Sequence, residues 1–258
     1  MAQPTGPATG RTVLVTGGSR GIGAAVVRAL HRDGARVLLH YGAAAGAARA
    51  VADELGDRVH LVQGDLADPA GPDTVWDRAL AATGRIDVLV NNAGAWIPSV
   101  LDDPADGTDP GETGWTRGWQ RNLALNLTAP ADLCRRAIQH FRTIGGGIVV
   151  NITSRSAHRG DDADHLAYGA AKGGLLALTK GIARGYARDN VLAYAIAPGW
   201  VGTEISAGEL DEQKLAALPL GEVTPATDVA EVVAFLASGR SRHTTGATID
   251  ITGADYVR

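Results

Sequence analysis

Short apolar runs that alternate with helical patterns along the whole chain are the feature that most constrains its fold. Each run is nearly continuous in apolar residues and rich in β-branched ones, which is typical of parallel strands buried on both faces. The runs cover residues 12–16, 36–40, 58–63, 86–91, 147–153, 191–197 and 247–251. This alternation predicts a single-domain Rossmann-type α/β fold, with one doubly wound parallel sheet of about seven strands and helices on both faces.

The domain organisation follows from the same pattern. Residues 1–10 contain neither a charged start nor an apolar stretch, and we expect them to form a disordered tail before one domain over residues 11–258. Residues 98–118 are rich in Pro, Gly and Asp and predict an inserted loop. Residues 200–222 are weakly periodic and predict a second long loop, which we interpret as a substrate loop.

Composition excludes several classes of function. The chain carries 24 Lys and Arg against 28 Asp and Glu without a basic run, so nucleic acid is not an expected partner. No segment approaches the roughly 18 apolar residues of a membrane helix. Cys134 is the single cysteine, which excludes an intrachain disulfide and suits a cytoplasmic protein. The seven histidines show no metal-ligand spacing, so we predict no catalytic metal.

A glycine-rich turn follows the first predicted strand directly and leads into a helix. Gly17 and Gly21 would allow a sharp turn close to a pyrophosphate, while Gly23 would allow close packing of the helix. Backbone N–H groups and the helix dipole would then face the anion. The alternative interpretation is a tight strand-to-helix turn without a ligand.

The spacing Gly-x-x-x-Gly-x-Gly, preceded by Thr16, resembles the motif of the short-chain dehydrogenase/reductase family, single-domain branch. Further landmarks occur in the family's order over residues 11–253. They are Asn91-Asn92-Ala93-Gly94, Asn126, Ser154, the Tyr168-x-x-x-Lys172 pair and Pro198-Gly199. The resemblance is strongest to members of the 3-oxoacyl-acyl-carrier-protein reductase type.

The resemblance implies a catalytic tetrad of Asn126, Ser154, Tyr168 and Lys172. Tyr168 and Lys172 lie four residues apart in a helical stretch, so they share one face, although such pairs are more often surface pairs. An ordinary tyrosine has a pKa of about 10, and we expect a neighbouring ammonium and the nicotinamide charge to favour phenolate. By resemblance, Tyr168 is the acid/base.

Two other members of the implied tetrad have local explanations. Ser154 ends a strand where ligands bind in open α/β sheets, and Ser156 is the alternative. Pro130 has no N–H to return to the carbonyl of Asn126, so the helix should bend there and leave that oxygen free. The resemblance implies that this oxygen supports a water that relays protons to Lys172. A solvent-facing Asn126 in a kinked helix is the alternative.

The cofactor implied by the resemblance is NADP(H), with NAD(H) possible. The second strand ends without the acidic residue typical of NAD-specific folds, and Arg20 could pair with a 2'-phosphate through two hydrogen bonds, or be a solvated helix-start residue. Asp65 is expected to contact the cofactor, with the capping of a helix as its alternative role. The expected cofactor-binding residues are Gly17, Ser19, Arg20, Gly21, Ile22, Gly23, Asp65, Leu66, Asn91, Ala93, Gly94, Tyr168, Lys172, Pro198, Gly199, Val201 and Thr203.

The implied activity is interconversion of a ketone and a secondary alcohol on a small molecule, with a 3-oxoacyl-thioester reductase favoured and a homotetramer or homodimer expected. Alternatives are an NAD-dependent sugar or steroid alcohol dehydrogenase and a non-catalytic dinucleotide sensor on the same fold. Trp96 and Trp200 are expected either in the pocket wall or in the core. The polar segment 159–164, where the chain is slightly longer than is usual in the family, is expected to be exposed.

Overall fold

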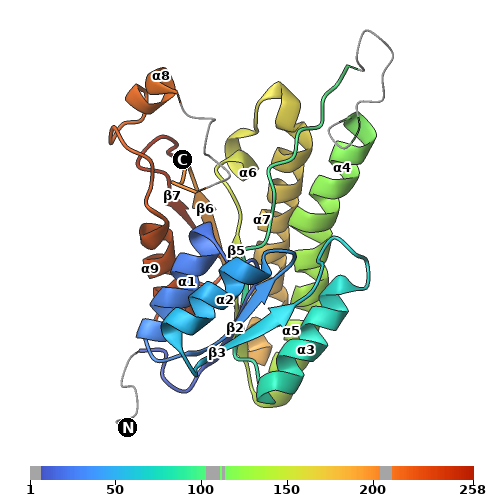
Figure 1. The fold of residues 1–258 in the computed structure, drawn as a ribbon, viewed down its shortest axis with the longest axis vertical. Helices are drawn as coiled ribbons and strands as arrows, with labels where there is room; N and C mark the ends of the chain where they lie inside the picture. Colours follow the sequence, from blue (N-terminus) through green and yellow to red (C-terminus); the bar gives the residue numbers. More distant parts are fainter. Residues whose placement is uncertain (1–6, 103–110, 112–113, 204–210) are drawn as a thin grey trace.

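A computed structural model describes residues 7–102, 111, 114–203 and 211–258 of the protein (Figure 1). Within these residues, seven parallel strands form one sheet in the order β3-β2-β1-β4-β5-β6-β7. Each predicted run became a strand with ends within two residues of the prediction, which confirms the fold class. The strands are β1 (Thr12–Val15), β2 (Arg36–Tyr41), β3 (Val59–Gln63), β4 (Val88–Asn91), β5 (Gly147–Ile152), β6 (Val191–Pro198) and β7 (Thr248–Ile251).

Helices cover both faces of the sheet because successive strand residues point to opposite sides. Val15 packs in one apolar cluster with α1 (Gly21–Arg32), α2 (Ala45–Leu55) and α9 (Ala226–Ala237). Leu14 packs in the other cluster with α3 (Gly71–Thr83), α5 (Ala129–Ile144) and α7 (Leu166–Tyr186). The remaining helical segments are α4 (Trp115–Leu123), η2 (Ala124–Thr128), α6 (Ser156–Arg159), η3 (Ala163–His165), η4 (Ala187–Asp189), α8 (Glu212–Ala216) and η5 (Arg242–Thr244).

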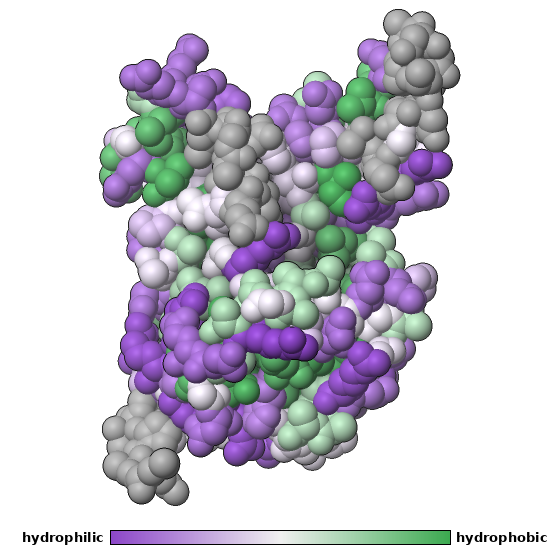
Figure 2. Space-filling model, viewed as in Figure 1, coloured by the Kyte–Doolittle hydropathy of each residue, from purple (hydrophilic) through white to green (hydrophobic). Residues whose placement is uncertain are grey.

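The strand order creates a crevice at one edge of the sheet. From β1 the chain moves outward through β2 and β3, and then crosses back to place β4 on the other side of β1. The connections that leave β1 and β4 therefore diverge at their carboxyl ends, which is where ligands bind in doubly wound sheets. In the space-filling view this edge is hollowed between the lobe that carries α8 and the lobe that carries α4 and α6 (Figure 2).

Three expectations about irregular segments need correction. Residues 7–10 belong to the fold rather than to a disordered tail, because Ala8 is fully buried and its N–H donates to Asp33 O at 2.9 Å. The inserted loop ends before α4 begins at Trp115, while residues 103–110 and 112–113 of the prediction lie outside the described residues. The predicted substrate loop contains α8, and its residues 204–210 also lie outside the described part.

A buried polar chain connects the strands beneath the crevice to α7. Asn91 Nδ2 on β4 donates to Asn151 Oδ1 on β5 at 2.8 Å, and Asn151 Nδ2 donates to Thr179 Oγ1 on α7 at 2.8 Å. Each of these three residues is at most 2% exposed. Because water does not compete at these positions, the hydrogen bonds fix α7 against the sheet.

The Asn151→Ala substitution tests this connection. It removes one partner from both Asn91 and Thr179, so we expect the free energy of unfolding to fall by about 2–4 kcal/mol, measured by urea denaturation. The exposed Gln139→Ala change on α5 is the control, and we expect it to stay within about 0.5 kcal/mol of wild type. A loss for Asn151→Ala no larger than that of the control would contradict the proposed role.

Candidate active site

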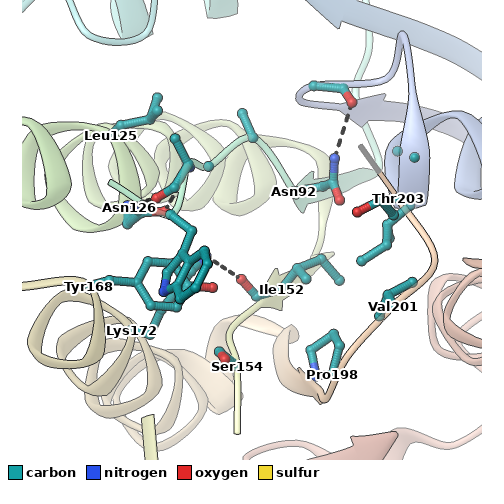
Figure 3. Close-up of a pocket in the computed structure, with 18 of the residues that line it drawn as sticks. Asn92, Leu125, Asn126, Ile152, Ser154, Tyr168, Lys172, Pro198, Val201 and Thr203 are labelled. Atoms are coloured by element: carbon teal, nitrogen blue, oxygen red, sulfur yellow. Dashed lines mark hydrogen bonds between the residues drawn. The ribbon is translucent and has the colours of Figure 1, made fainter. Parts of the chain in front are cut away.

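A cavity of ≈ 780 Å³ lies at the carboxyl edge of the sheet, which is within the ~300–1,000 Å³ usual for small-molecule sites. All four residues of the expected tetrad line it, and so do all the expected cofactor-binding residues except Asn91. Figure 3 shows residues from β5, α7 and the segment after β6 converging on it. Residues far apart in the sequence are therefore brought together as the landmarks predicted.

The glycine turn has the backbone geometry that its sequence predicts. Gly17 and Gly21 have φ angles of 63° and 52°, in the region that favours glycine. A Cβ at Gly23 would lie 2.0 Å from Gly17 O, so this glycine lets α1 start directly against the turn itself. The result is a concave backbone surface at a helix N-terminus, which fits a dinucleotide pyrophosphate.

His40, at the end of β2, holds this turn in place. Its Nδ1 accepts from the N–H of Gly17 at 3.1 Å, and its Nε2 donates to Gly64 O at 3.1 Å. Burial lowers the pKa of His40 to about 4, so the ring is neutral and can accept from Gly17. Sequence reasoning missed this role, since the only signal was a polar residue near the end of an apolar strand.

Thr16 and Asn92 connect the turn to the end of β4. The Thr16 hydroxyl accepts from the N–H groups of Asn92 and Ala93, each at 2.9 Å, and donates to Val90 O at 3.3 Å. Asn92 Nδ2 donates to Thr16 O at 2.9 Å and to Gly17 O at 3.1 Å (Figure 3). These contacts join the two sides of the crevice between β1 and β4.

Asn91 does not line the cavity, so its assignment as a cofactor-binding residue stays a prediction without support from its side chain. Its side chain lies below the cavity, where it donates to Asn151 and contacts Cys134 Sγ at 3.3 Å. Neighbouring strand residues point to opposite faces, so Asn92 lines the cavity instead. Asp65 lines the cavity and caps no helix, because α3 begins at Gly71 and the bond from the N–H of Ala67 to Asp65 Oδ1, 2.9 Å long, lies in the turn before it.

Lys172 and Tyr168 project from α7 toward the end of β5. Lys172 Nζ donates to Ile152 O at 3.0 Å and lies 5.6 Å from the centre of the Tyr168 ring (Figure 3). Gly94 leaves room for this group, because a Cβ there would lie 3.3 Å from Lys172 Nζ and 2.6 Å from Asn126 Oδ1. The predicted shared face of Tyr168 and Lys172 is thus present, and it faces the cavity.

Asn126 lies in a widened helical turn. Residues 124–128 form the π-helical segment η2, in which the N–H of Ala129 donates to Ala124 O. The distortion occurs where Pro130 predicted a bend, and such π turns are frequent at functional sites. The Asn126 side chain is fixed by bonds to Ala95, donating to its O at 2.9 Å and accepting from its N–H at 3.3 Å. The role of its main-chain oxygen stays a prediction.

Ser154 rather than Ser156 affects the pKa of Tyr168. The hydroxyl groups of the two serines lie 3.1 Å apart, and both residues line the cavity. A hydrogen bond from Ser154 acts on the Tyr168 phenol and partly opposes the rise of its pKa. Ser154 Oγ also accepts from the N–H of Ser156 at 3.1 Å, which fixes its position.

Burial shifts both titrating groups toward their neutral forms. Desolvation raises the pKa of Tyr168 to about 12 and lowers that of Lys172 to about 8. The expected lowering of the Tyr168 pKa is therefore absent in the cofactor-free site, because burial outweighs the hydrogen bond from Ser154. The phenol accordingly holds its proton at neutral pH and is prepared to act as an acid.

Aromatic side chains form the far wall of the cavity. Trp96 stacks on His165 with ring centres 3.6 Å apart, and Trp200 stands nearly perpendicular to Trp96 at 6.0 Å. Both tryptophans line the cavity, so the pocket-wall interpretation is the correct one. The Arg155 guanidinium lies 5.2 Å from the centre of the Trp200 ring and forms an ion pair with Asp255.

The C-terminal segment contacts the helix that follows Ser154. His158 on α6 stacks on Tyr256 with ring centres 5.9 Å apart, and the Arg155 to Asp255 ion pair joins the same two segments.

Over the described residues, no helix is long and apolar enough to cross a membrane. No group of three or more His, Cys, Asp or Glu side chains that could hold a metal occurs in that part of the chain.

Comparisons with known proteins agree with this geometry. Residues 17–253 match the family model described as enoyl-(acyl carrier protein) reductase. The chain is 35% identical to 3beta-hydroxysteroid dehydrogenase 1 of Eggerthella lenta, over 95% of this chain and 93% of the relative. It is 30% identical to 3-oxoacyl-acyl-carrier-protein reductase FabG of Escherichia coli, over 96% and 98% of the two chains.

Solved structures with similar folds include two that contain NADP. A short chain dehydrogenase of Burkholderia cenocepacia has a TM-score of 0.85 and 32% identity, covering 96% of this chain and 98% of that one. The angucycline C-6 ketoreductase LanV has a TM-score of 0.82 and 32% identity, covering 96% of each chain. The chain belongs to the short-chain dehydrogenase/reductase family, whose members are oxidoreductases that act on CH–OH and ketone groups.

Burial of the Lys172 ammonium predicts a measurable effect on the stability of the cofactor-free protein. Its folded-state pKa of about 8 lies below the ordinary 10.5, so the folded protein binds fewer protons between these values and its stability rises with pH there. We expect Lys172→Met to raise the free energy of unfolding at pH 7 by about 1–2 kcal/mol, after the lost bond to Ile152 is counted.

Urea unfolding between pH 7 and pH 10 measures this effect. The rise of stability with pH above pH 8 should be weaker in Lys172→Met than in wild type. Lys180→Met, two turns further along α7 and exposed, is the matched control and should leave the pH profile unchanged. A Lys172→Met protein that is less stable than wild type at pH 7 would show that burial of the Lys172 ammonium does not lower the free energy of unfolding.

Proposed function

We propose that this protein is an NADP(H)-dependent oxidoreductase that interconverts a ketone and a secondary alcohol, with Tyr168 as the acid/base. The observation that carries the proposal is that Tyr168, Ser154 and Lys172 line the same cavity as the glycine turn, with Lys172 Nζ 5.6 Å from the centre of the Tyr168 ring. The hydroxyl groups of Ser154 and Tyr168 border one cavity, and two such donors suit the oxygen of a carbonyl. A non-catalytic dinucleotide sensor, the alternative, would not require the hydroxyl groups of Ser154 and Tyr168 in the same cavity.

The backbone of the turn fits a dinucleotide, because Gly17, Gly21 and Gly23 leave open the surface that side chains would fill. When bound, NADPH supplies the hydride that reaches the carbonyl carbon. Ser154 holds the carbonyl oxygen and Tyr168 donates the proton to it as the charge develops. Lys172, held by Ile152 O, places a cationic group behind the phenol and stabilises the phenolate that remains.

The substrate class favoured by this proposal is a 3-oxoacyl thioester or a related ketone. The 30% sequence identity to FabG over nearly the full chain supports this choice. The named activity of LanV, an angucycline ketoreductase, supports ketone reduction more generally. The similarity to a 3beta-hydroxysteroid dehydrogenase supports the alternative of a steroid alcohol substrate. We also propose a cytoplasmic homotetramer or homodimer, since members of the family commonly assemble from identical chains.

The Tyr168→Phe substitution tests the acid/base assignment. It removes the transferable proton and leaves the glycine turn intact, so we expect kcat for ketone reduction to fall at least a hundredfold. The dissociation constant for NADPH should change less than threefold, measured by the fluorescence of the bound nucleotide. Tyr186→Phe, at the exposed end of α7, is the control. Ketone reduction by Tyr168→Phe within tenfold of wild type would refute the assignment.

The Arg20→Ala substitution tests the nucleotide preference. Arg20 lines the cavity beside the residues that follow β2, where the ribose of the adenosine would lie. Loss of a guanidinium–phosphate pair should reduce the ratio of kcat/KM with NADPH to kcat/KM with NADH by about tenfold or more. Arg36→Ala, at the opposite end of β2, should not change it. A wild-type preference for NADH, or an unchanged ratio in Arg20→Ala, would contradict the proposed pairing.

A further inference from the structure

Two buried asparagines, one helical turn apart, hold the segment that follows β4. Asn122, near the end of α4, and Asn126, in η2, are both fully buried. Asn126 exchanges two hydrogen bonds with the backbone of Ala95. Asn122 Nδ2 donates to Ile97 O at 2.8 Å, and its Oδ1 accepts from Asn126 Nδ2 at 3.3 Å. The two amides are therefore joined to each other and to alternate residues of the segment.

Trp96 lies between the two residues that these amides hold, and it lines the cavity. Its ring stacks on His165 with ring centres 3.6 Å apart and meets Trp200 at an angle of 89°. Water does not compete for the amide hydrogen bonds, because Asn122 and Asn126 are fully buried. Since the backbone is held on both sides of Trp96, these bonds determine where its ring enters the cavity wall.

The segment is also confined further along its path. A Cβ at Gly118 on α4 would lie 2.7 Å from Ser99 Cα, so the chain passes directly against this glycine. The N–H of Ser99 donates to Asp164 O at 2.6 Å. Asp164 belongs to the polar stretch 159–164, whose residues are exposed as expected, apart from the half-buried Asp161. The chain between β4 and η3 thus follows one defined path.

Asn122 does not line the cavity, so it can influence a bound molecule only through its neighbours. We propose that Asn122 is a positioning residue, which places Trp96 in the wall that binds the substrate by holding Ile97 O. This inference rests on the proposed function, because it assigns the wall to the ketone substrate. Asn126 keeps its two bonds to Ala95 when the Asn122 amide is removed, so the change should affect substrate affinity rather than the chemical step.

The Asn122→Leu substitution removes the donor to Ile97 O and keeps a branched side chain. The ketones tested with NADPH are ethyl 3-oxobutanoate, ethyl 3-oxo-3-phenylpropanoate and 4-methylcyclohexanone. For those that the wild-type enzyme reduces, we expect KM to rise about fivefold or more and kcat to stay within about threefold. Gln120→Leu, which replaces an exposed amide of α4, is the matched control and should leave KM unchanged. Asn122→Ala replaces Asn122→Leu in every measurement if the leucine variant does not fold.

A double-mutant cycle with Trp96→Ala determines whether Asn122 acts through Trp96. In the Trp96→Ala background, Asn122→Leu should change KM less than about twofold, because the ring that it places is already absent. A general loss of structure would instead change KM equally in both backgrounds. An equal effect in both backgrounds, an unchanged KM in Asn122→Leu, or a lower kcat at unchanged KM would overturn the inference.

Circular dichroism tests the position of Trp96 without turnover. The rings of Trp96 and Trp200, with centres 6.0 Å apart, are close enough to give an exciton couplet. A Trp115→Phe background removes the tryptophan pair of α4, and the signal lost on Trp200→Phe then identifies the couplet. We expect Asn122→Leu to reduce this couplet by about half or more and Gln120→Leu to preserve it. An unchanged couplet in Asn122→Leu would overturn the inference.

The two kinds of measurement separate this inference from the proposed function. If the wild-type enzyme reduced no ketone with NADPH, the proposed function would be refuted, while the couplet would still decide whether Asn122 places Trp96. Ketone reduction together with an unchanged couplet and an unchanged KM in Asn122→Leu would leave the proposed function standing and refute the positioning role.

Discussion

The hydroxyl of Thr16 is the contact on which the site depends. It joins the carboxyl end of β1 to the chain leaving β4 by accepting two N–H groups and donating to a carbonyl of β4. These two strands flank the point where the winding of the sheet reverses. Because the connections diverge there, their backbone groups would otherwise lose the pairing that the sheet supplies. Thr16 satisfies them with one side chain and sets the width of the crevice.

The ammonium group of Lys172 is held in this site at a cost in stability at neutral pH, because burial disfavours its charge. Lys172 is buried and Tyr168 is half-buried at the cavity, and each is shifted toward its neutral form. A bound nucleotide and substrate would change that balance, because they bring charge and hydrogen-bonding groups into the same space. The buried hydrogen bonds from Asn91 through Asn151 to Thr179 fix α7, which carries Tyr168 and Lys172, against the sheet.

Local sequence patterns predicted the parts of the protein that local chemistry determines. The strands were recognisable because burial on both faces requires continuous apolar runs, and the turn because Gly17 and Gly21 need positive φ angles. The roles of Asn91 and Asn92 could not be separated from sequence, because a strand alternates its faces and its last residue is ambiguous. The role of His40 was not predicted, since it acts through Gly17 and Gly64, which are distant in sequence. The pKa of Tyr168 depends on how deeply the fold buries it, which no motif encodes.

The C-terminal segment of this chain supports a residue of the cavity wall, Arg155, from outside the cavity. Asp255 and Tyr256 hold Arg155 and His158, and Arg155 immediately follows the serine that faces Tyr168. An affinity tag appended after Arg258 would lie beside these contacts, whereas the segment that leads into β1 at Thr12 lies at the amino edge of the sheet, opposite the cavity. Purification handles for this enzyme therefore belong at the amino end, where they do not disturb the contacts that hold Arg155 and His158.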